Sequence, residues 1–129
     1  LPLLASAAVA ADFDWIHELN KRAEAEPSEF RANLAVRFKM GDAQVNAVLG
    51  NVARPADAYM VFRLGEMSAK PPDYVIGHYK SDKGKGWGVV AKSLGIKPGS
   101  KEFHALKNGH DLYGANHKDK GKGKGKGKK

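Results

Sequence analysis

Apolar residues recur at intervals of three and four through most of this chain, from about residue 12 to residue 109. That spacing places them on one face of an α-helix. Pro, Gly and Ser divide the pattern into short segments, and no segment alternates apolar and polar residues as a half-buried strand does. The pattern predicts an all-α fold: a compact single domain of six or seven short helices spanning about residues 11–113.

Local start and stop signals give the limits of the predicted helices. Pro27 opens the second helix, Gly41 ends it, and Asp42 is expected to cap the third. Pro55 suits the first position of the fourth helix because proline lacks the N–H that would be unpaired there. The first five helices are therefore expected near residues 12–25, 27–40, 42–49, 55–67 and from 71 onward. The fourth helix is predicted to be largely buried, because it carries many apolar residues. These are Tyr59, Met60, Phe62, Leu64 and Met67.

A weak internal repeat supports the helical interpretation. At an offset of 30 residues, Val45 aligns with Val75, and the pair Leu64–Gly65 aligns with Leu94–Gly95. Each copy is expected to contain a short helix, a loop and a second helix, because repeats of this length are typical of stacked helical units.

The stretch from residue 86 to 109, "GWGVVAKSLGIKPGSKEFHALKNG", predicts two helices joined by a tight corner. Gly95 is expected to adopt the left-handed conformation that ends a helix, with Ile96 folding back on the last turn. Pro98 prevents continuation. Ser100 is placed to cap the next helix through its side-chain oxygen, and Gly109 to close it.

The same stretch resembles the helix-turn-helix pattern of bacterial repressors, in which a second helix enters the DNA major groove. The match is incomplete, since Lys101 falls where a buried β-branched residue normally packs, and Phe103 and Leu106 arrive two positions late. A helix-turn-helix-like DNA-binding protein reading through residues 89–109, with Lys97, Lys101 and Lys107 as its contacts, is therefore kept as the alternative function.

A second resemblance covers more of the chain. "GWGVVAKSLGIKPGSKEFHALK" is similar to the C-terminal signature of an uncharacterised family of small exported bacterial helical proteins, over most of residues 30–109. The resemblance implies fold and export, and no catalytic residue comes with it. Its most distinctive positions are interpreted as a structural motif, and they are Gly86, Trp87, Gly88, Leu94, Gly95, Pro98, Gly99, Ser100, Phe103 and Leu106.

The residue types point away from catalysis. The chain has no Cys, which excludes disulfides, thiol catalysis and cysteine-ligated metals. His104, His110 and His117 are spaced by six and seven residues, which suits neither one helix face nor the HExxH arrangement. We therefore expect no enzyme, catalytic residue, cofactor or metal. A ligand cavity remains an alternative to simple core packing for five aromatic residues, which are Tyr59, Phe62, Tyr74, Tyr79 and Trp87.

The first ten residues, "LPLLASAAVA", are apolar and small, and Ala8 and Ala10 match the A-x-A pattern before a cut between Ala10 and Ala11. We interpret residues 1–10 as a residual signal peptide, which predicts a periplasmic or secreted protein. The run is too short to span a bilayer. Residues 114–129 are expected to form a disordered basic tail, because alternating Gly and Lys offers no apolar face.

The net charge of +8 resides mainly in that tail, where residues 118–129 contain seven Lys and one Asp. Flexible ammonium groups bind polyanions by releasing counterions, without reading sequence. The sequence thus predicts an exported non-enzymatic binding or structural protein whose helical body docks while the tail adheres to anionic polymer: polysaccharide, lipopolysaccharide or extracellular nucleic acid. The predicted contacts are Lys118, Lys120, Lys122, Lys124, Lys126, Lys128 and Lys129.

Overall fold

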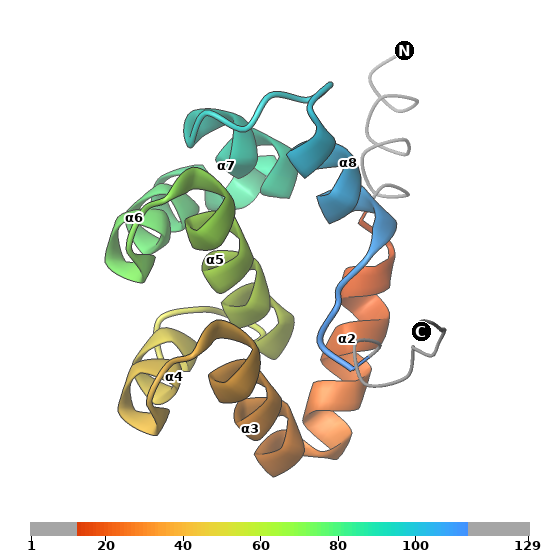
Figure 1. Cartoon of the computed structure of the whole chain (residues 1–129), viewed down its shortest axis with the longest axis vertical. Coiled ribbons are helices and arrows are strands. Elements are labelled where there is room, and N and C mark those ends of the chain that lie inside the picture. Colours follow the sequence, from red (N-terminus) through yellow and green to blue (C-terminus); the bar gives the residue numbers. More distant parts are fainter. Residues whose placement is uncertain (1–12, 114–129) are drawn as a thin grey trace, which may run out of the picture.

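The computed structural model describes residues 13–113, with the backbone alone for Lys83. Within that range the chain is all-α and compact, with seven α-helices, a short 3₁₀ turn and no strand, as predicted (Figure 1). Residues 1–10 and 114–129, predicted as signal peptide and tail, lie outside it. The elements are α2 (Trp15–Ala25), α3 (Pro27–Phe38), α4 (Asp42–Leu49), α5 (Pro55–Ser68), α6 (Pro72–Asp82), η1 (Lys83–Lys85), α7 (Trp87–Ser93) and α8 (Lys101–Asn108).

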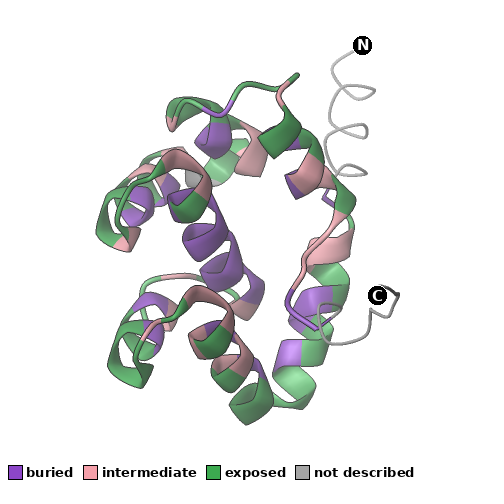
Figure 2. Ribbon diagram, in the orientation of Figure 1, coloured by how far each residue is buried: buried purple, intermediate pink, exposed green. Residues whose placement is uncertain are grey.

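Helix α5 forms the centre of the fold. Helices α2, α4 and α6 all pack against it, and every residue from Ala56 to Gly65 is buried (Figure 2). The prediction of a buried fourth helix is confirmed, although Met67 is only half-buried. Two of the buried residues, Asp57 and Arg63, are charged, and each must therefore find polar partners inside the domain.

Proline begins three of the helices as expected, at Pro27, Pro55 and Pro72. The predicted boundary between α3 and α4 is wrong in detail. Helix α3 ends before Lys39, which adopts a left-handed conformation with φ of 55°. The extended residue Gly41, rather than Asp42, then caps α4. With Lys39 left-handed, the N–H of Met40 donates to the carbonyl oxygen of Ala35 at 3.0 Å, and this hydrogen bond closes the end of the helix.

The turn after α3 has a counterpart 30 residues later. Ala69 is left-handed with φ of 59°, and the N–H of Lys70 donates to the carbonyl of Gly65 at 3.0 Å. The hairpins α3–α4 and α5–α6 are therefore built alike, which agrees with the aligned pair Val45 and Val75, both buried. The other aligned pair is not equivalent, because Gly65 lies inside a helix and Gly95 follows one.

The corner between α7 and α8 matches its prediction. Gly95 is left-handed with φ of 91°, and the N–H of Ile96 donates to the carbonyl of Ala91 at 3.0 Å, which is the hydrogen bond of a Schellman cap. The side chain of Ser100 accepts a hydrogen bond from the N–H of Phe103 at 3.1 Å. Seven residues, from 94 to 100, separate the helices, whereas a helix-turn-helix uses about three or four.

The residues of the structural motif contribute to packing and to the turns around α7. Phe103 and Leu106 are buried, and Trp87 stacks on Tyr79 with ring centroids 5.2 Å apart. Gly86 has φ of 95°, a value that favours glycine and orients the chain into α7. Of the aromatic residues weighed as cavity lining, Tyr59, Phe62 and Tyr79 are buried, Trp87 is half-buried and Tyr74 is exposed.

The close turn after α5 predicts a marked cost for a methyl group at Gly65. A Cβ atom there would lie 2.8 Å from the backbone carbonyl oxygen of Lys70, so the α5–α6 hairpin must shift. We expect Gly65→Ala to lower the free energy of unfolding by about 1–3 kcal/mol, measured by urea denaturation. Gly77→Ala is the control, since no atom lies within 4 Å of its Cβ, and it should be neutral or stabilising by up to about 1 kcal/mol. Equal effects at both glycines would contradict this account of the turn.

Candidate functional site

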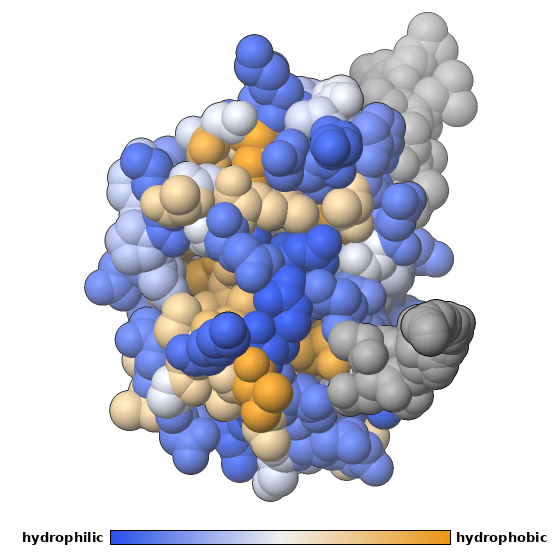
Figure 3. Space-filling view, in the orientation of Figure 1, coloured by the Kyte–Doolittle hydropathy of each residue, from blue (hydrophilic) through white to orange (hydrophobic). Residues whose placement is uncertain are grey.

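The segment that follows α8 crosses back over the helical body. Gly109 leaves α8 with φ of 141°, and the chain then runs beside α2 in the ribbon view (Figure 1). Leu112 and Tyr113, the last described residues, are buried. The space between α5 and this segment is filled by side chains, many of them hydrophilic (Figure 3). The segment is therefore a packed part of the domain.

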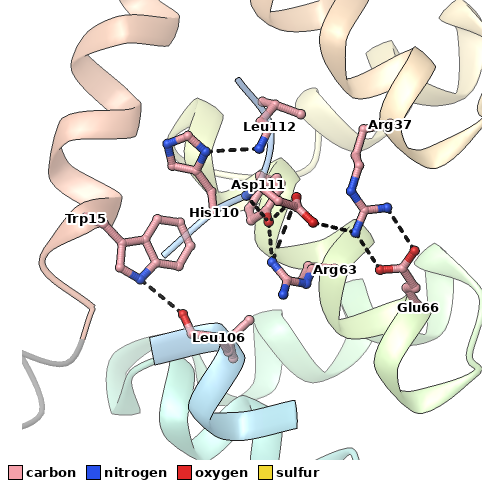
Figure 4. A network of polar contacts seen from close by, with 9 residues as sticks. Trp15, Arg37, Arg63, Glu66, Leu106, His110, Asp111 and Leu112 are labelled. Atoms are coloured by element: carbon pink, nitrogen blue, oxygen red, sulfur yellow. Dashed lines mark hydrogen bonds and ion pairs between the residues drawn. The ribbon is translucent and has the colours of Figure 1, made fainter. Parts of the chain in front are cut away.

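Asp111 is the polar centre of this region. Its Oδ1 atom accepts a hydrogen bond from the hydroxyl of Tyr59 at 2.9 Å, and its Oδ2 atom pairs with the guanidinium of Arg37 at 2.9 Å. The backbone N–H of Asp111 donates in turn to the Tyr59 hydroxyl oxygen at 3.1 Å. Arg63 donates to the same hydroxyl and lies 3.9 Å from Oδ1 of Asp111. The side chains of Arg37, Arg63 and Asp111 point toward one another from α3, α5 and the C-terminal segment (Figure 4).

Glu66 completes the cluster. Both of its carboxylate oxygens accept hydrogen bonds from Arg37, at 2.8 and 2.9 Å, in the two-pronged geometry that gives the strongest arginine–carboxylate pairs. Arg37 thus joins α5 to the C-terminal segment by contacting a carboxylate on each. We call these five residues, which are Arg37, Tyr59, Arg63, Glu66 and Asp111, the C-terminal clasp.

The pKa values in the clasp reflect its charge pairing. Burial alone would raise the pKa of Asp111, but hydrogen bonds from Arg37 and Tyr59 and the positive charge of Arg63 outweigh it, so the pKa is lowered. The hydrogen bonds from Arg37 likewise lower the pKa of Glu66. Burial raises the pKa of Tyr59 to about 12. At neutral pH the cluster therefore holds two carboxylates, two guanidinium groups and a neutral phenol.

An aromatic group covers one side of the clasp. The rings of Trp15 and His110 lie 5.8 and 6.0 Å from that of Tyr59, both edge-on. Trp15 also donates its indole N–H to the carbonyl oxygen of Leu106 at 3.1 Å, which attaches α2 to the end of α8. Burial lowers the pKa of His110, and its Nδ1 atom accepts the N–H of Leu112 at 3.1 Å. The imidazole is therefore neutral and has a structural role in the segment.

The clasp is suited to holding rather than to chemistry. It contains no hydroxyl or thiol activated by a neighbouring base, because the Tyr59 hydroxyl is engaged by Asp111 and Arg63 and its pKa is raised. What the arrangement does is fix the chain at Asp111 to Tyr113 on the helical body. Residues further along the chain are therefore attached at a defined place on the surface.

Sequence reasoning placed the end of the helical domain near residue 113 but did not predict the packed segment after α8 or its partners. The seven lysines predicted to bind polyanions lie outside the described residues. Of the three residues predicted for DNA contact, Lys97 and Lys101 are exposed, and Lys107 is half-buried with its ammonium 5.6 Å from the Phe103 ring centroid. One signal for the clasp was present, because Arg63 stands between Phe62 and Leu64 in a helix predicted to be buried.

Comparison with known proteins adds no relative: no family model, curated protein or solved structure matches the chain. Within residues 13–113, no three or more His, Asp or Glu side chains gather as a metal site would require. None of the helices in that range has the length and hydrophobicity needed to cross a membrane.

The lowered pKa of Asp111 predicts a specific acid sensitivity. Because the pKa is lower in the folded state, the clasp stabilises the protein above the unfolded-state pKa and loses that contribution as pH falls through the acidic range. Asp111→Asn should lower the free energy of unfolding by about 1 kcal/mol at pH 7, a modest value because the Asp111 side chain is 40% exposed. The variant should also lose less stability than the wild type between pH 7 and pH 3.

Thermal unfolding across this pH range, followed by circular dichroism, measures the effect. Asp73→Asn is the matched control, since Asp73 is an exposed acid on α6 that forms no ion pair within the described residues. Parallel pH curves for the wild type and Asp111→Asn would contradict the role assigned to the clasp.

Proposed function

We propose that this protein is an exported, non-enzymatic binding protein that adheres to anionic polymer through residues 118–129, which we call the basic segment. The supporting observation is the segregation of charge along the chain. Seven lysines and one aspartate occupy these twelve residues, while the whole chain carries a net charge of +8. The helical body accounts for little of that excess.

Five basic side chains among the described residues form ion pairs with acidic ones. Arg37 is bound by Glu66 and Asp111, Arg54 pairs with Glu24 at 2.7 Å, and Lys85 lies 3.8 Å from Asp82. The basic segment has one carboxylate for seven ammonium groups. A polyanion meeting the protein therefore gains most from contact with the basic segment, where the net positive charge of the chain is concentrated.

The C-terminal clasp attaches the basic segment firmly to the helical body. Lys118 follows Tyr113 by five residues, so its Cα atom lies within about 18 Å of that of Tyr113, whatever path the chain takes. Polymer bound at Lys118 is thereby held near the helical body. The clasp and the burial of Leu112 and Tyr113 prevent the attachment point from peeling away.

The helix-turn-helix alternative has weaker support. Lys97 and Lys101 are exposed, but the seven-residue connection between α7 and α8 differs from the short turn that sets the angle of a recognition helix. The two functions make different predictions about which lysines bind nucleic acid, so one set of variants separates them.

Replacing the seven lysines of the basic segment by Gln should abolish most of the retention on heparin and on duplex DNA. A matched variant, Lys97→Gln with Lys101→Gln and Lys107→Gln, should elute like the wild type. The measurement is the salt concentration of elution for each protein. Retention lost in the second variant and kept in the first would instead support the helix-turn-helix alternative.

The salt dependence provides a quantitative check. Each phosphate neutralised contributes about 0.9 to the slope of log affinity against log salt on B-DNA. A basic segment that engages all its lysines should therefore give a slope of magnitude about 6 for the wild type. The segment variant should give a slope near zero, and equal slopes for both proteins would overturn the proposal.

Export is tested separately through the N-terminus of the mature protein. Ala8 and Ala10 fit the recognition pattern of a signal peptidase, so the protein recovered from the periplasm or medium should begin at Ala11. N-terminal sequencing measures this directly. Ala10→Trp should block the cut, because the position takes only small residues. Recovery from the cytosol of a protein that retains residues 1–10 would contradict the assignment.

A further inference from the structure

A cavity of about 200 Å³ lies where the start of α5 meets α6 and α7. It is lined by Ala53, Asp57, Tyr79, Gly86, Trp87 and Val90. None of these residues belongs to the C-terminal clasp or to the basic segment. The lining combines one carboxylate with two large aromatic rings, and this combination recognises a particular chemical class.

Asp57 supplies the charge of this cavity. It is only 9% exposed, and its Oδ2 atom accepts the hydroxyl of Tyr79 at 2.8 Å and the N–H of Arg54 at 3.2 Å. Among the described side chains, no Lys, Arg or His forms an ion pair with this carboxylate, and no donor bonds to its Oδ1 atom. Burying a charge without an opposite charge is costly, so a cation that entered the cavity would be favoured.

Arg54, whose backbone N–H binds Asp57, has its positive charge engaged with another residue. The guanidinium of Arg54 donates to the carboxylate of Glu24 through two nitrogens, at 2.7 and 3.2 Å. That pair is exposed and lies on the outer surface of α2 and α5. Arg54 thus contributes its backbone N–H to Asp57 while its positive charge is directed to another acid.

Trp87 and Tyr79 supply the aromatic walls. Their rings are nearly parallel, with an interplanar angle of 26°, and the Tyr79 hydroxyl is fixed by Asp57 and by the N–H of Ala53 at 3.0 Å. Trp87 also borders a second hollow, of about 390 Å³, on the side of α2, which it shares with Ile16, His17 and Asn20. Trp87 therefore borders both hollows, while one face of its half-buried indole packs on the Tyr79 ring.

We propose that this cavity binds the head of a small alkylammonium compound, with Asp57 as the counter-charge and Trp87 as the aromatic surface. The electron-rich faces of indole and phenol attract organic cations, and a desolvated carboxylate strengthens that attraction. A neutral ligand of the same shape lacks the charge attraction to Asp57, and an anionic one is repelled by it. The site is independent of the proposed adhesion to polyanions, which uses positive charges on another part of the chain.

Both primary amines, such as the end of a lysine side chain, and quaternary amines, such as choline, carry this chemistry. A primary ammonium can donate hydrogen bonds to the free oxygen of Asp57, whereas a quaternary ammonium relies on the aromatic faces and on charge. Titration with n-butylammonium and with choline distinguishes the two sources. The uncharged compound 3,3-dimethylbutanol has the shape of choline and serves as the matched control ligand.

The measurement is the position of the Trp87 indole N–H signal in ¹H–¹⁵N NMR spectra of the full chain. We expect a saturable shift with at least one of the two cations and no saturable shift with 3,3-dimethylbutanol. The indole signal of Trp15, which lies in the aromatic group beside the clasp, should stay in place. Saturable shifts of equal size with choline and with its neutral analogue would overturn the proposal, as would the absence of saturation with both cations.

Variants then test the two roles. Asp57→Asn keeps an oxygen that can accept from Tyr79 and Arg54 but removes the charge, and should weaken cation binding by about tenfold or more. Asp73→Asn removes the same charge from the exposed surface of α6 and should leave binding unchanged. Wild-type affinity in a folded Asp57→Asn variant, judged by its NMR spectrum, would overturn the proposal. If the Asp57→Asn variant unfolds, the proposal is tested by the wild type alone, through its responses to the two cations and to 3,3-dimethylbutanol.

Discussion

The fold depends on the burial of one helix, α5, on nearly all sides. Ten consecutive residues from Ala56 to Gly65 are removed from water, so the two charged residues among them, Asp57 and Arg63, must be satisfied by groups from other elements. Asp57 lies in the first turn, where the helix dipole favours a negative charge. Arg63 lies two turns later and reaches Tyr59 and Asp111. Each buried charge organises one of the two polar sites of the domain.

These two sites differ in how completely the chain satisfies them. Around Arg63, the positive groups meet two carboxylates and a phenol, so the C-terminal clasp is closed and structural. Around Asp57, hydrogen bonds reach one oxygen and no described side chain offers a positive charge. A cluster whose charges are neutralised within the chain stabilises the fold. A buried carboxylate without an opposite charge can still attract a cation. This contrast separates the role of the clasp from that of the cavity beside Trp87.

Helix ends were predictable from the sequence where a residue acts on its immediate neighbours. The two polar sites were not predictable, because their residues lie far apart in the sequence. Pro55, Gly95 and Ser100 act on their immediate neighbours, so their effects were predicted correctly. The left-handed ends at Lys39 and Ala69 were missed because neither residue type favours that conformation. Tyr59 and Asp111 are 52 residues apart, and nothing in the spacing of apolar residues indicates that they meet.

The residues that precede the basic segment, 111–113, are held on the helical body by apolar burial as well as by ion pairs. Burying a large apolar side chain such as that of Leu112 contributes about 1.5–3 kcal/mol. The ring of Tyr113 is buried as well, but its hydroxyl has no hydrogen-bond partner among the described residues, and this offsets part of its contribution. Partly exposed ion pairs such as that of Arg37 with Asp111 contribute about 1 kcal/mol or less, and salt weakens them. Salt that releases the basic segment from a polyanion therefore leaves the segment's attachment to the body nearly intact, because apolar burial is not screened. The clasp fixes where the segment is attached, while the buried side chain of Leu112 and the ring of Tyr113 supply the part of the attachment that salt does not weaken.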